Sequence, residues 1–256
     1  MIAVVTGASS GIGQATARRL AQAHGAALVL VARREERLRE LAGEIGGATI
    51  VACDLTAADA PGQVREAVEQ HHGGRLDLLV NNAGRGGRGD FAEIGYAGVA
   101  RTMALNFDAQ LRLTEALLPL LRASAPSSIV NVASTAGRIA RGGSGAYSAS
   151  KFALIGWSEA LYYEEAAHGV HVGVVNPGFV STEGFPQTEL TSNPRTRWLV
   201  SDVEKVVDAI VAAGPGGRPE RYAPRGYGLL AAARMVAPAL VRRVVGGADL
   251  STATKL

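Results

Sequence analysis

The chain has 256 residues, of which 47% are hydrophobic and 32 are glycine, and its formal net charge is +3. These values suit one α/β domain with a sizeable core and many tight turns, and they exclude a disordered chain. The single cysteine, Cys53, excludes an internal disulfide framework and a cysteine-based zinc cluster, and it is typical of a reducing, cytoplasmic setting.

Hydropathy and charge patterning exclude further classes of protein. No run of 18 uninterrupted apolar residues and no signal-peptide pattern occur, so we expect neither a membrane-spanning helix nor secretion. Arginine accounts for nearly all of the basic residues, but no basic stripe interleaved with aromatic residues suggests a nucleic-acid partner. The five histidines lack the spacing of metal ligands, and we expect no metal site.

The first predicted element is a short buried strand at residues 2–5, followed by a turn of small residues from Thr6 to Gly13. From Ile12 onwards apolar positions recur at helical spacing until Gly25, where a helix would end. A strand, a glycine turn and a helix present backbone N–H groups and a positive helix end to a pyrophosphate. The spacing G-x-x-x-G-x-G differs from the standard dinucleotide motif G-x-G-x-x-G. Three glycines would allow, in order, the tight turn, the approach of the phosphates and the packing of the helix: Gly7, Gly11 and Gly13.

Apolar runs and helical stretches alternate along the chain that follows. Further strands are expected at residues 26–32, 49–53, 77–81, 128–133 and 170–175. Helices are expected at residues 34–45, 61–72, 99–121 and 147–168. This alternation implies a parallel sheet with helices on both faces, so we predict a single doubly wound, three-layer α/β/α domain over residues 1–256. Ligands should bind beyond the carboxyl ends of its strands.

The turn Thr6–Gly13 resembles the cofactor turn of the short-chain dehydrogenase/reductase family, in its compact single-domain branch. Asn-Asn-Ala-Gly at residues 81–84 and Asn-Pro-Gly at residues 176–178 extend the resemblance as far as about Thr182. It implies a Rossmann-type fold, a nicotinamide cofactor and a structural role for Asn81. The resemblance and the patterns together predict these cofactor-binding residues: Gly7, Ser9, Ser10, Gly11, Ile12, Gly13, Arg33, Arg34, Asp54, Leu55, Asn82, Ala83, Gly84, Tyr147, Lys151, Pro177, Gly178, Val180 and Thr182.

The end of the second strand predicts which dinucleotide is bound. It reads Ala32-Arg33-Arg34, with no acidic residue before Glu35. NAD sites usually place a carboxylate there, whereas a guanidinium binds the 2′-phosphate of NADP, so we expect NADP (NADPH) and consider NAD less favoured. The alternative is that both arginines merely begin a solvated helix. Asp54 likewise has two possible roles. The resemblance implies a contact with the adenine, and the alternative is a helix N-cap or loop acid.

Tyr147-Ser148-Ala149-Ser150-Lys151 carries the expected chemistry, because a tyrosine and a lysine four residues apart share one face of a helix. An ammonium near the phenol lowers the pKa of Tyr147 toward a working range. Ser134 lies 13 positions before Tyr147. The resemblance implies that Ser134 holds the substrate oxygen, that Tyr147 exchanges a proton with it and that Lys151 holds the nicotinamide ribose. It also implies a proton-relay water at the backbone of Asn106. Each residue alone has an ordinary structural explanation, and the ordered combination favours catalysis.

We therefore predict an NADP-dependent oxidoreductase that transfers hydride between the nicotinamide and a secondary alcohol, ketone or aldehyde. The alternative is a non-catalytic dinucleotide-binding regulatory protein on the same fold, and an epimerase or dehydratase is a weaker third possibility. The sequence does not identify the substrate. Four arginines should flank the pocket mouth, but arginine is so abundant that chance explains them best: Arg85, Arg88, Arg138 and Arg141.

Two predictions concern assembly and the tail. The predicted helices from Val99 and Tyr147 are the resembled family's usual subunit interface, and an apolar surface of Ala153, Leu154, Trp157 and Leu161 favours a homodimer or homotetramer. Residues 183–200 are expected to form a substrate lid. Residues 218–256 are basic and apolar, with Pro238 breaking any helix there. This tail is expected to pack beside the pocket or on a partner subunit, the alternative being weak contact with an anionic membrane surface.

Overall fold

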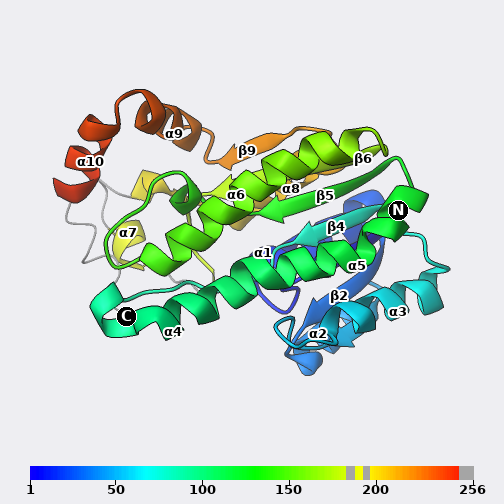
Figure 1. The fold of residues 1–256 in the computed structure, drawn as a ribbon. Coiled ribbons are helices and arrows are strands. Elements are labelled where there is room, and N and C mark those ends of the chain that lie inside the picture. The colour runs from blue at the N-terminus through cyan, green and yellow to red at the C-terminus, as the bar shows by residue number, and fades with distance from the viewer. Residues whose placement is uncertain (183–187, 193–196, 248–256) are drawn as a thin grey trace.

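The computed structural model describes residues 1–182, 188–192 and 197–247 of the chain. At its centre lies a seven-stranded sheet in the order β3-β2-β1-β4-β5-β6-β9, in which every pairing is parallel (Figure 1). The strands are β1 (Ile2–Thr6), β2 (Ala27–Ala32), β3 (Thr49–Ala52), β4 (Leu78–Asn81), β5 (Ser127–Val132), β6 (Val170–Pro177) and β9 (Glu220–Ala223). The order reverses between β1 and β4, which places a topological switch point beside the glycine turn.

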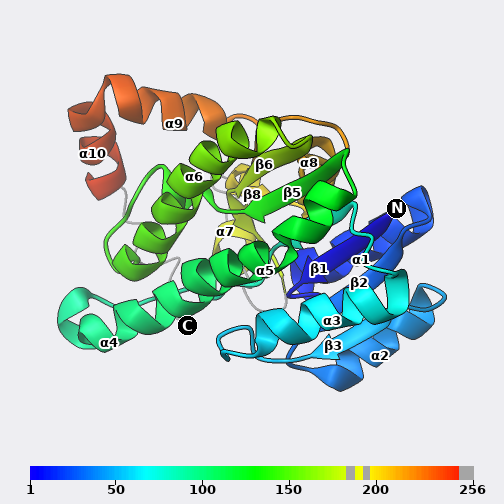
Figure 2. The same cartoon turned by 45° about the vertical axis from the view of Figure 1, so that its right-hand side comes forward.

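Helices cover both faces of the sheet, so the predicted doubly wound α/β fold is confirmed (Figures 1 and 2). One face packs on α1 (Gly11–His24), α2 (Glu35–Glu44) and α8 (Val203–Ala213). The other packs on α3 (Ala60–His72), α5 (Ala109–Ala123) and α6 (Gly145–Ala166). Alternate residues of β2 enter the two cores, which is why this strand reads as an unbroken apolar run.

The predicted helix at residues 99–121 differs from the observed structure. Helix α4 (Phe91–Met103) begins earlier, is kinked at Gly95 and leads through a π-helical turn, Ala104–Asp108, into α5. The kink follows from Gly95, whose φ of 56° lies in the left-handed region. The π-helical turn has no hydropathy pattern of its own, so periodicity alone does not reveal it.

The sequence patterns also missed the elements after β6. A small two-stranded sheet pairs β7 (Phe179–Val180) with β8 (Val200–Ser201), and α8 and β9 follow. The described part of the expected lid holds α7 (Thr188–Ser192) and a 3₁₀ turn (Arg197–Leu199), while 183–187 and 193–196 lie outside the described residues. In the tail, α9 (Tyr227–Val236) ends just before α10 (Pro238–Gly247), the break that Pro238 predicts. Residues 248–256 of the tail are not described.

A buried chain of hydrogen bonds joins four elements in the middle of the fold. Asn81 of β4 donates its side-chain amide to Thr114 Oγ1 of α5 at 3.0 Å and to Asn131 Oδ1 of β5 at 2.9 Å. Asn131 in turn donates to Ser158 Oγ of α6 at 2.8 Å. Buried amides must be paired, so this chain fixes how α5 and α6 sit on the strands. Asn81 thus has the expected structural role, through the side chains of Thr114 and Asn131.

Two residues expected in a subunit interface lie inside the subunit instead. Leu154 and Leu161 were expected on a free apolar face, but both are buried in the core of this subunit. Helix α6 spans the sheet along 22 residues, so its apolar residues on more than one side meet β5, β6 and the loop after Ser134. No helix among the described residues has the length and apolar character needed to cross a membrane.

Candidate active site

The glycine turn between β1 and α1 has the geometry of an anion cradle. Gly7 and Gly11 have φ angles of 67° and 56°, which L side chains rarely adopt. A Cβ on Gly13 would lie 2.3 Å from the carbonyl oxygen of Gly7, so only glycine lets α1 pack this closely. The first turn of α1 carries no acidic residue and Ser10 makes no side-chain cap, so its N–H groups remain available to a phosphate.

Thr6 joins this turn to the loop after β4. Its Oγ1 accepts hydrogen bonds from the backbone N–H groups of Asn82 at 2.9 Å and Ala83 at 3.0 Å. The same hydroxyl donates to the carbonyl oxygen of Val80 at 3.1 Å. The Asn82 side chain donates to the Thr6 carbonyl oxygen at 2.9 Å. A single buried threonine therefore holds two of the predicted cofactor segments in register.

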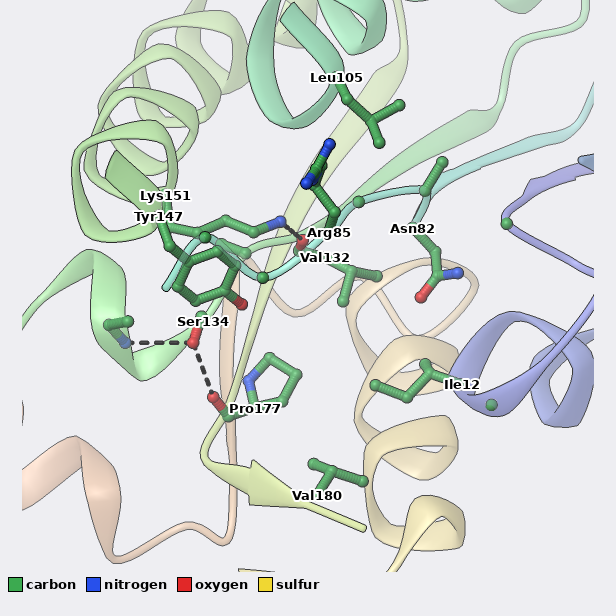
Figure 3. Close-up of a pocket in the computed structure, with 18 of the residues that line it drawn as sticks. Ile12, Asn82, Arg85, Leu105, Val132, Ser134, Tyr147, Lys151, Pro177 and Val180 are labelled. Carbon is green, nitrogen blue, oxygen red and sulfur yellow. Dashed lines mark hydrogen bonds between the residues drawn. The ribbon is translucent and has the colours of Figure 1, made fainter. Parts of the chain in front are cut away.

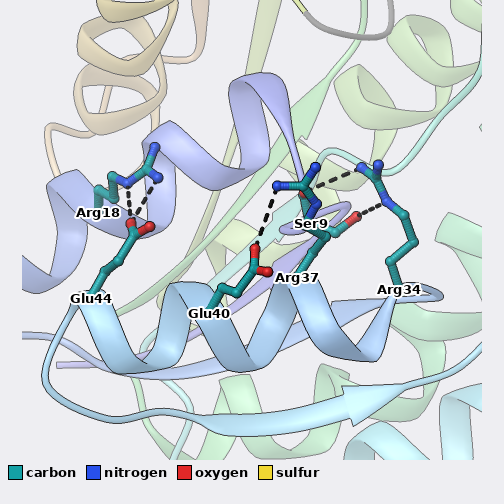
Figure 4. Close-up of polar contacts among 6 residues, drawn as sticks. All are labelled: Ser9, Arg18, Arg34, Arg37, Glu40 and Glu44. Carbon is teal, nitrogen blue, oxygen red and sulfur yellow. Dashed lines mark hydrogen bonds and ion pairs between the residues drawn. The ribbon is translucent and has the colours of Figure 1, made fainter.

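Arg34 bends back from the start of α2 onto the glycine turn (Figure 4). Its Nε donates to Ser9 Oγ at 3.3 Å and its terminal nitrogen donates to the Ser9 carbonyl oxygen at 3.2 Å. Arg33 is exposed and lies near Asp54, whose pKa its charge helps to lower. Two guanidinium groups therefore stand at the end of β2, where the sequence predicts the 2′-phosphate of NADP.

Asp54 has the second of its two predicted roles, that of a loop cap. Its Oδ1 accepts hydrogen bonds from the backbone N–H of Thr56 at 2.9 Å and from Thr56 Oγ1 at 2.8 Å. These bonds are the main reason that its pKa is lowered. The residue is therefore a loop cap, and it also lines the cavity described next.

A cavity of about 800 Å³ runs from the glycine turn, past the carboxyl ends of the strands, to Tyr147 and beyond (Figure 3). It lies at the switch point of the sheet, and it is elongated in the way that a dinucleotide with a substrate requires. Gly13 does not line it, because that glycine packs against Gly7. The other predicted cofactor-binding residues line it: Gly7, Ser9, Ser10, Gly11, Ile12, Arg33, Arg34, Asp54, Leu55, Asn82, Ala83, Gly84, Tyr147, Lys151, Pro177, Gly178, Val180 and Thr182.

Tyr147 and Ser134 meet with their hydroxyl groups side by side at the far end of this cavity (Figure 3). Ser134 follows β5, and its Oγ accepts a hydrogen bond from the Ala136 N–H at 3.1 Å and donates to the Pro177 carbonyl oxygen at 3.4 Å. Burial raises the pKa of Tyr147, while Ser134 and the charge of Arg141 lower it. This direction is opposite to the one expected, and Lys151 is not among the groups that shift it.

Lys151 lies one helical turn after Tyr147 and is almost fully buried. Its Nζ donates to the carbonyl oxygen of Val132 at 2.8 Å and lies 5.9 Å from the centre of the Tyr147 ring. Burial lowers the pKa of Lys151 to about 8, so the ammonium is only moderately favoured at neutral pH.

Asn106 sits in the π-helical turn, beneath the cavity rather than in its wall. Its side chain accepts from the backbone N–H of Arg85 at 2.9 Å, and donates to the Arg85 carbonyl oxygen at 2.9 Å and to Ser150 Oγ at 3.1 Å. A π-helical turn is rare and often marks a functional site. Asn106 therefore links the loop after Gly84 to the helix that carries Tyr147 and Lys151.

Tyr227 is a cavity residue that the sequence did not reveal. It comes from the first turn of α9, and its ring would be 2.6 Å from a Cβ on Gly178, so Gly178 must be glycine for this contact. Burial raises its pKa to about 12, and its hydroxyl donates to the Leu199 carbonyl oxygen at 3.0 Å. Leu199 and Leu230 line the cavity beside it. The only sequence signal was an aromatic residue before an apolar run.

Three of the four arginines expected at the pocket mouth do line the cavity, namely Arg85, Arg88 and Arg141, and Arg101 of α4 joins them. Arg138 does not line it. It forms an ion pair of 3.0 Å with Glu220, whose carboxylate also accepts from Asn176 at 2.7 Å. That pair ties the loop after Ser134 to β6 and β9.

The sequence matches the short chain dehydrogenase family over residues 1–192. The chain belongs to this family. The granaticin polyketide synthase putative ketoacyl reductase 1 of Streptomyces violaceoruber is 40% identical over 228 residues, which cover 85% of this chain and 80% of that protein. An uncharacterized oxidoreductase of Staphylococcus epidermidis is 34% identical over 213 residues, covering 83% and 90% of the two chains. The crystal structure of a short-chain dehydrogenase from Streptomyces avermitilis superposes with a TM-score of 0.80 at 29% identity, covering 100% of this chain and 98% of that one. The chain is thus an oxidoreductase of the short-chain dehydrogenase family.

Proposed function

We propose that the protein is an NADP-dependent carbonyl reductase or alcohol dehydrogenase that uses Tyr147 as its acid and base. The observation that carries the proposal is the meeting of Tyr147 and Ser134, with Lys151 behind them, in the same cavity that begins at the glycine turn. A bound nicotinamide would supply or accept the hydride. The fold alone would not give this function, but these side chains in one elongated cavity support it.

The side chains support a division of labour in the direction of reduction. Ser134 would turn its hydroxyl hydrogen from the Pro177 carbonyl oxygen to the carbonyl oxygen of the substrate, and so hold that oxygen beside the Tyr147 hydroxyl. The raised pKa of Tyr147 keeps the phenol protonated, as a proton donor to that oxygen requires. Lys151, held by Val132, would bind the ribose of the cofactor, and Asn106 would hold the helix and loop around them.

The preference for NADP is supported by the charges at the end of β2. Arg33 and Arg34 line the cavity there, and Asp54 is the one acidic residue among its described lining residues. Its carboxylate is held by two hydrogen bonds from Thr56, and the two guanidinium groups outnumber its single negative charge. A ribose 2′-phosphate would gain charge-assisted hydrogen bonds from the two guanidinium groups.

A keto group on an acyl chain is the substrate type that a relative suggests, because the Streptomyces violaceoruber protein is named as a putative ketoacyl reductase. The test is a panel of ketones, aldehydes and secondary alcohols, with the absorbance of NADPH and NADH as the readout. Turnover of at least one ketone with NADPH supports the proposal. Tight binding of NADPH without turnover of any substrate would instead support the non-catalytic regulatory alternative.

We also propose a homodimer or homotetramer, now with a different surface from the one first expected. Helices α4 and α6 pack against each other and expose large aromatic side chains: Phe91 (70%), Tyr96 (80%) and Phe152 (44%). Exposed aromatic side chains on two helices that pack together favour a self-complementary interface. Light scattering should show a dimer or tetramer at micromolar concentration, and Tyr96→Ser with Phe152→Ser should shift it toward monomer.

The position of α9 supports packing of the tail beside the pocket rather than contact with a membrane surface. Tyr227 and Leu230 of α9 line the cavity, so this helix forms part of its wall. Removing all residues after Gly226 should therefore raise KM. Leu229, Met235 and Val236 are exposed by 77–84%, which keeps the membrane alternative open to test. Flotation of the full-length chain with anionic vesicles at low salt would support that alternative.

A further inference from the structure

Arg141 is a cation placed in the wall of the catalytic end of the cavity. It lies in the loop between Ser134 and α6, and its guanidinium stands 4.8 Å from the centre of the Phe179 ring. Both residues line the cavity. Its charge lowers the pKa of Tyr147, so the guanidinium is within electrostatic range of the proposed proton donor.

No carboxylate of the described chain pairs with Arg141. Burial is the main reason that the pKa of Arg141 is lowered, and a second cation, Arg88, lowers it further. Of the described residues, only two tyrosines, Tyr227 and Tyr147, act to raise this pKa. By contrast, Arg138, three residues earlier in the same loop, is paired with Glu220 at 3.0 Å. Holding an unpaired guanidinium partly buried is costly, and contact with one aromatic ring offsets only part of that cost. A ligand that brings a negative charge would offset more.

The surroundings of Arg141 add positive potential. Arg85, Arg88 and Arg101 line the same end of the cavity, and no acidic residue among the described lining residues stands there, because Asp54 lies at the other end. On its far side Arg141 also lines a small hollow of about 160 Å³, together with Arg234 of α9 and Arg242 of α10. Clustered charge of one sign with low-dielectric walls attracts ligands of the opposite sign.

The phosphates of a dinucleotide do not explain this charge. The glycine turn, Arg33 and Arg34 lie at the other end of the cavity, where they would bind the phosphates of the cofactor. Arg141 instead lies near Tyr147 and Tyr227. A group beside Arg141 would therefore belong to the substrate. Attached through a short chain to a carbonyl carbon near Tyr147, it would orient that carbonyl toward Ser134.

We propose that the substrate carries an acid group, a carboxylate or a phosphate, and that Arg141 binds it. This inference rests on the proposed function, because it assigns the part of the substrate that lies beyond the reacting carbonyl. Arginine suits the task, since its planar fork donates two parallel hydrogen bonds to an oxyanion. Ketones with a neutral tail or an ammonium group should be poor substrates.

The first test compares matched ketones. Wild type should reduce at least one of 4-oxopentanoate, 5-oxohexanoate and 6-oxoheptanoate with a kcat/KM at least tenfold above that of its methyl ester. Arg141→Gln should bring that ratio close to one, whatever its effect on the kcat/KM of the esters, and Arg141→Lys should restore part of the ratio. Arg218→Gln, an exposed arginine away from the cavity, is the charge-matched control and should keep the wild-type ratio. A wild-type ratio near one, or an unchanged ratio in Arg141→Gln, overturns the proposal.

The second test needs no turnover. Isothermal titration with hexanoate, hexyl phosphate and 1-hexanol should show binding of at least one of the two anions but not of the alcohol. Arg141→Gln should weaken that binding at least tenfold, and the better of the two anions identifies the acid group. If an anion binds through Arg141 but the protein reduces no ketone, the proposed reduction is refuted and the role of Arg141 in binding an acid group stands. If no anion binds and the protein reduces acids and esters equally well, the role of Arg141 is refuted and the proposed reduction stands.

Discussion

The ammonium of Lys151 donates a 2.8 Å hydrogen bond to the carbonyl oxygen of Val132, the last residue of β5. The lysine of the proposed catalytic group is thus held by the strand that leads to Ser134, rather than by Tyr147. Because this bond does not depend on the cofactor, it positions the long side chain before any ligand arrives.

The pH dependence of stability should report the burial of Lys151. Its pKa is about 8 in the folded protein and near 10.5 in an unfolded chain, so between these values the unfolded chain binds more protons. Stability due to this residue therefore rises as pH increases. The free energy of unfolding in urea of wild type, minus that of Lys151→Met, should therefore increase by about 2 kcal/mol between pH 7 and pH 10. A difference that is flat with pH would contradict the lowered pKa.

Replacement of the proposed acid should separate chemistry from binding. Tyr147→Phe removes the hydroxyl beside Ser134 and keeps the ring, so kcat should fall at least a thousandfold while NADPH still binds. Stopped-flow or steady-state absorbance gives kcat, and fluorescence titration gives the affinity for NADPH. Tyr163→Phe, on the exposed side of the same helix, is the control and should keep wild-type activity. Substantial turnover in Tyr147→Phe would rule out the assigned role.

Cofactor choice should depend on Arg34 and Arg33. Arg34→Gln removes a charge that is held against Ser9, and it should lower kcat/KM for NADPH about tenfold while changing that for NADH little. Ala32→Asp with Arg33→Ala should reverse the preference. Arg37→Gln serves as the control, because Arg37 pairs with Glu40 on the outer side of α2. A wild type that favours NADH would show that the two arginines only begin the helix.

The glycine turn offers a matched pair of glycine-to-alanine variants. Gly13→Ala places a Cβ 2.3 Å from a backbone oxygen, so the turn must shift, and we expect a loss of stability of about 1–3 kcal/mol with at least tenfold weaker NADPH binding. Gly43→Ala, in α2, meets nothing within 4 Å and should stabilise the protein by about 0.5–1 kcal/mol. Thermal unfolding with and without NADPH distinguishes them. Equal effects of both changes would contradict the packing role of Gly13.

Local patterns predicted the parts of the site that lie within one strand, turn or helix. The glycine turn, the tyrosine–lysine spacing and the apolar run of β2 each have a short-range physical cause, and the parallel sheet follows from the alternation of strands and helices along the chain. Contacts between distant segments could not be predicted in this way. Arg138 and Arg141 look alike in the sequence, yet one meets Glu220 from β9 while the other stands over Phe179. The place of Tyr227 against Gly178 depends equally on the path of the chain after β9.

That path has a consequence for how the protein can diversify. The residues expected to hold the dinucleotide all precede residue 183, whereas Tyr227 and Leu230 belong to α9, after the last strand of the sheet. If relatives exchanged the chain beyond β9, one wall of the substrate pocket would be replaced. The residues expected to bind the cofactor and transfer the proton would be unchanged. Ala223, which ends β9, is a natural crossover point for such chimaeras. Their substrate range should follow the donor of the C-terminal segment, and their cofactor preference the donor of the N-terminal one.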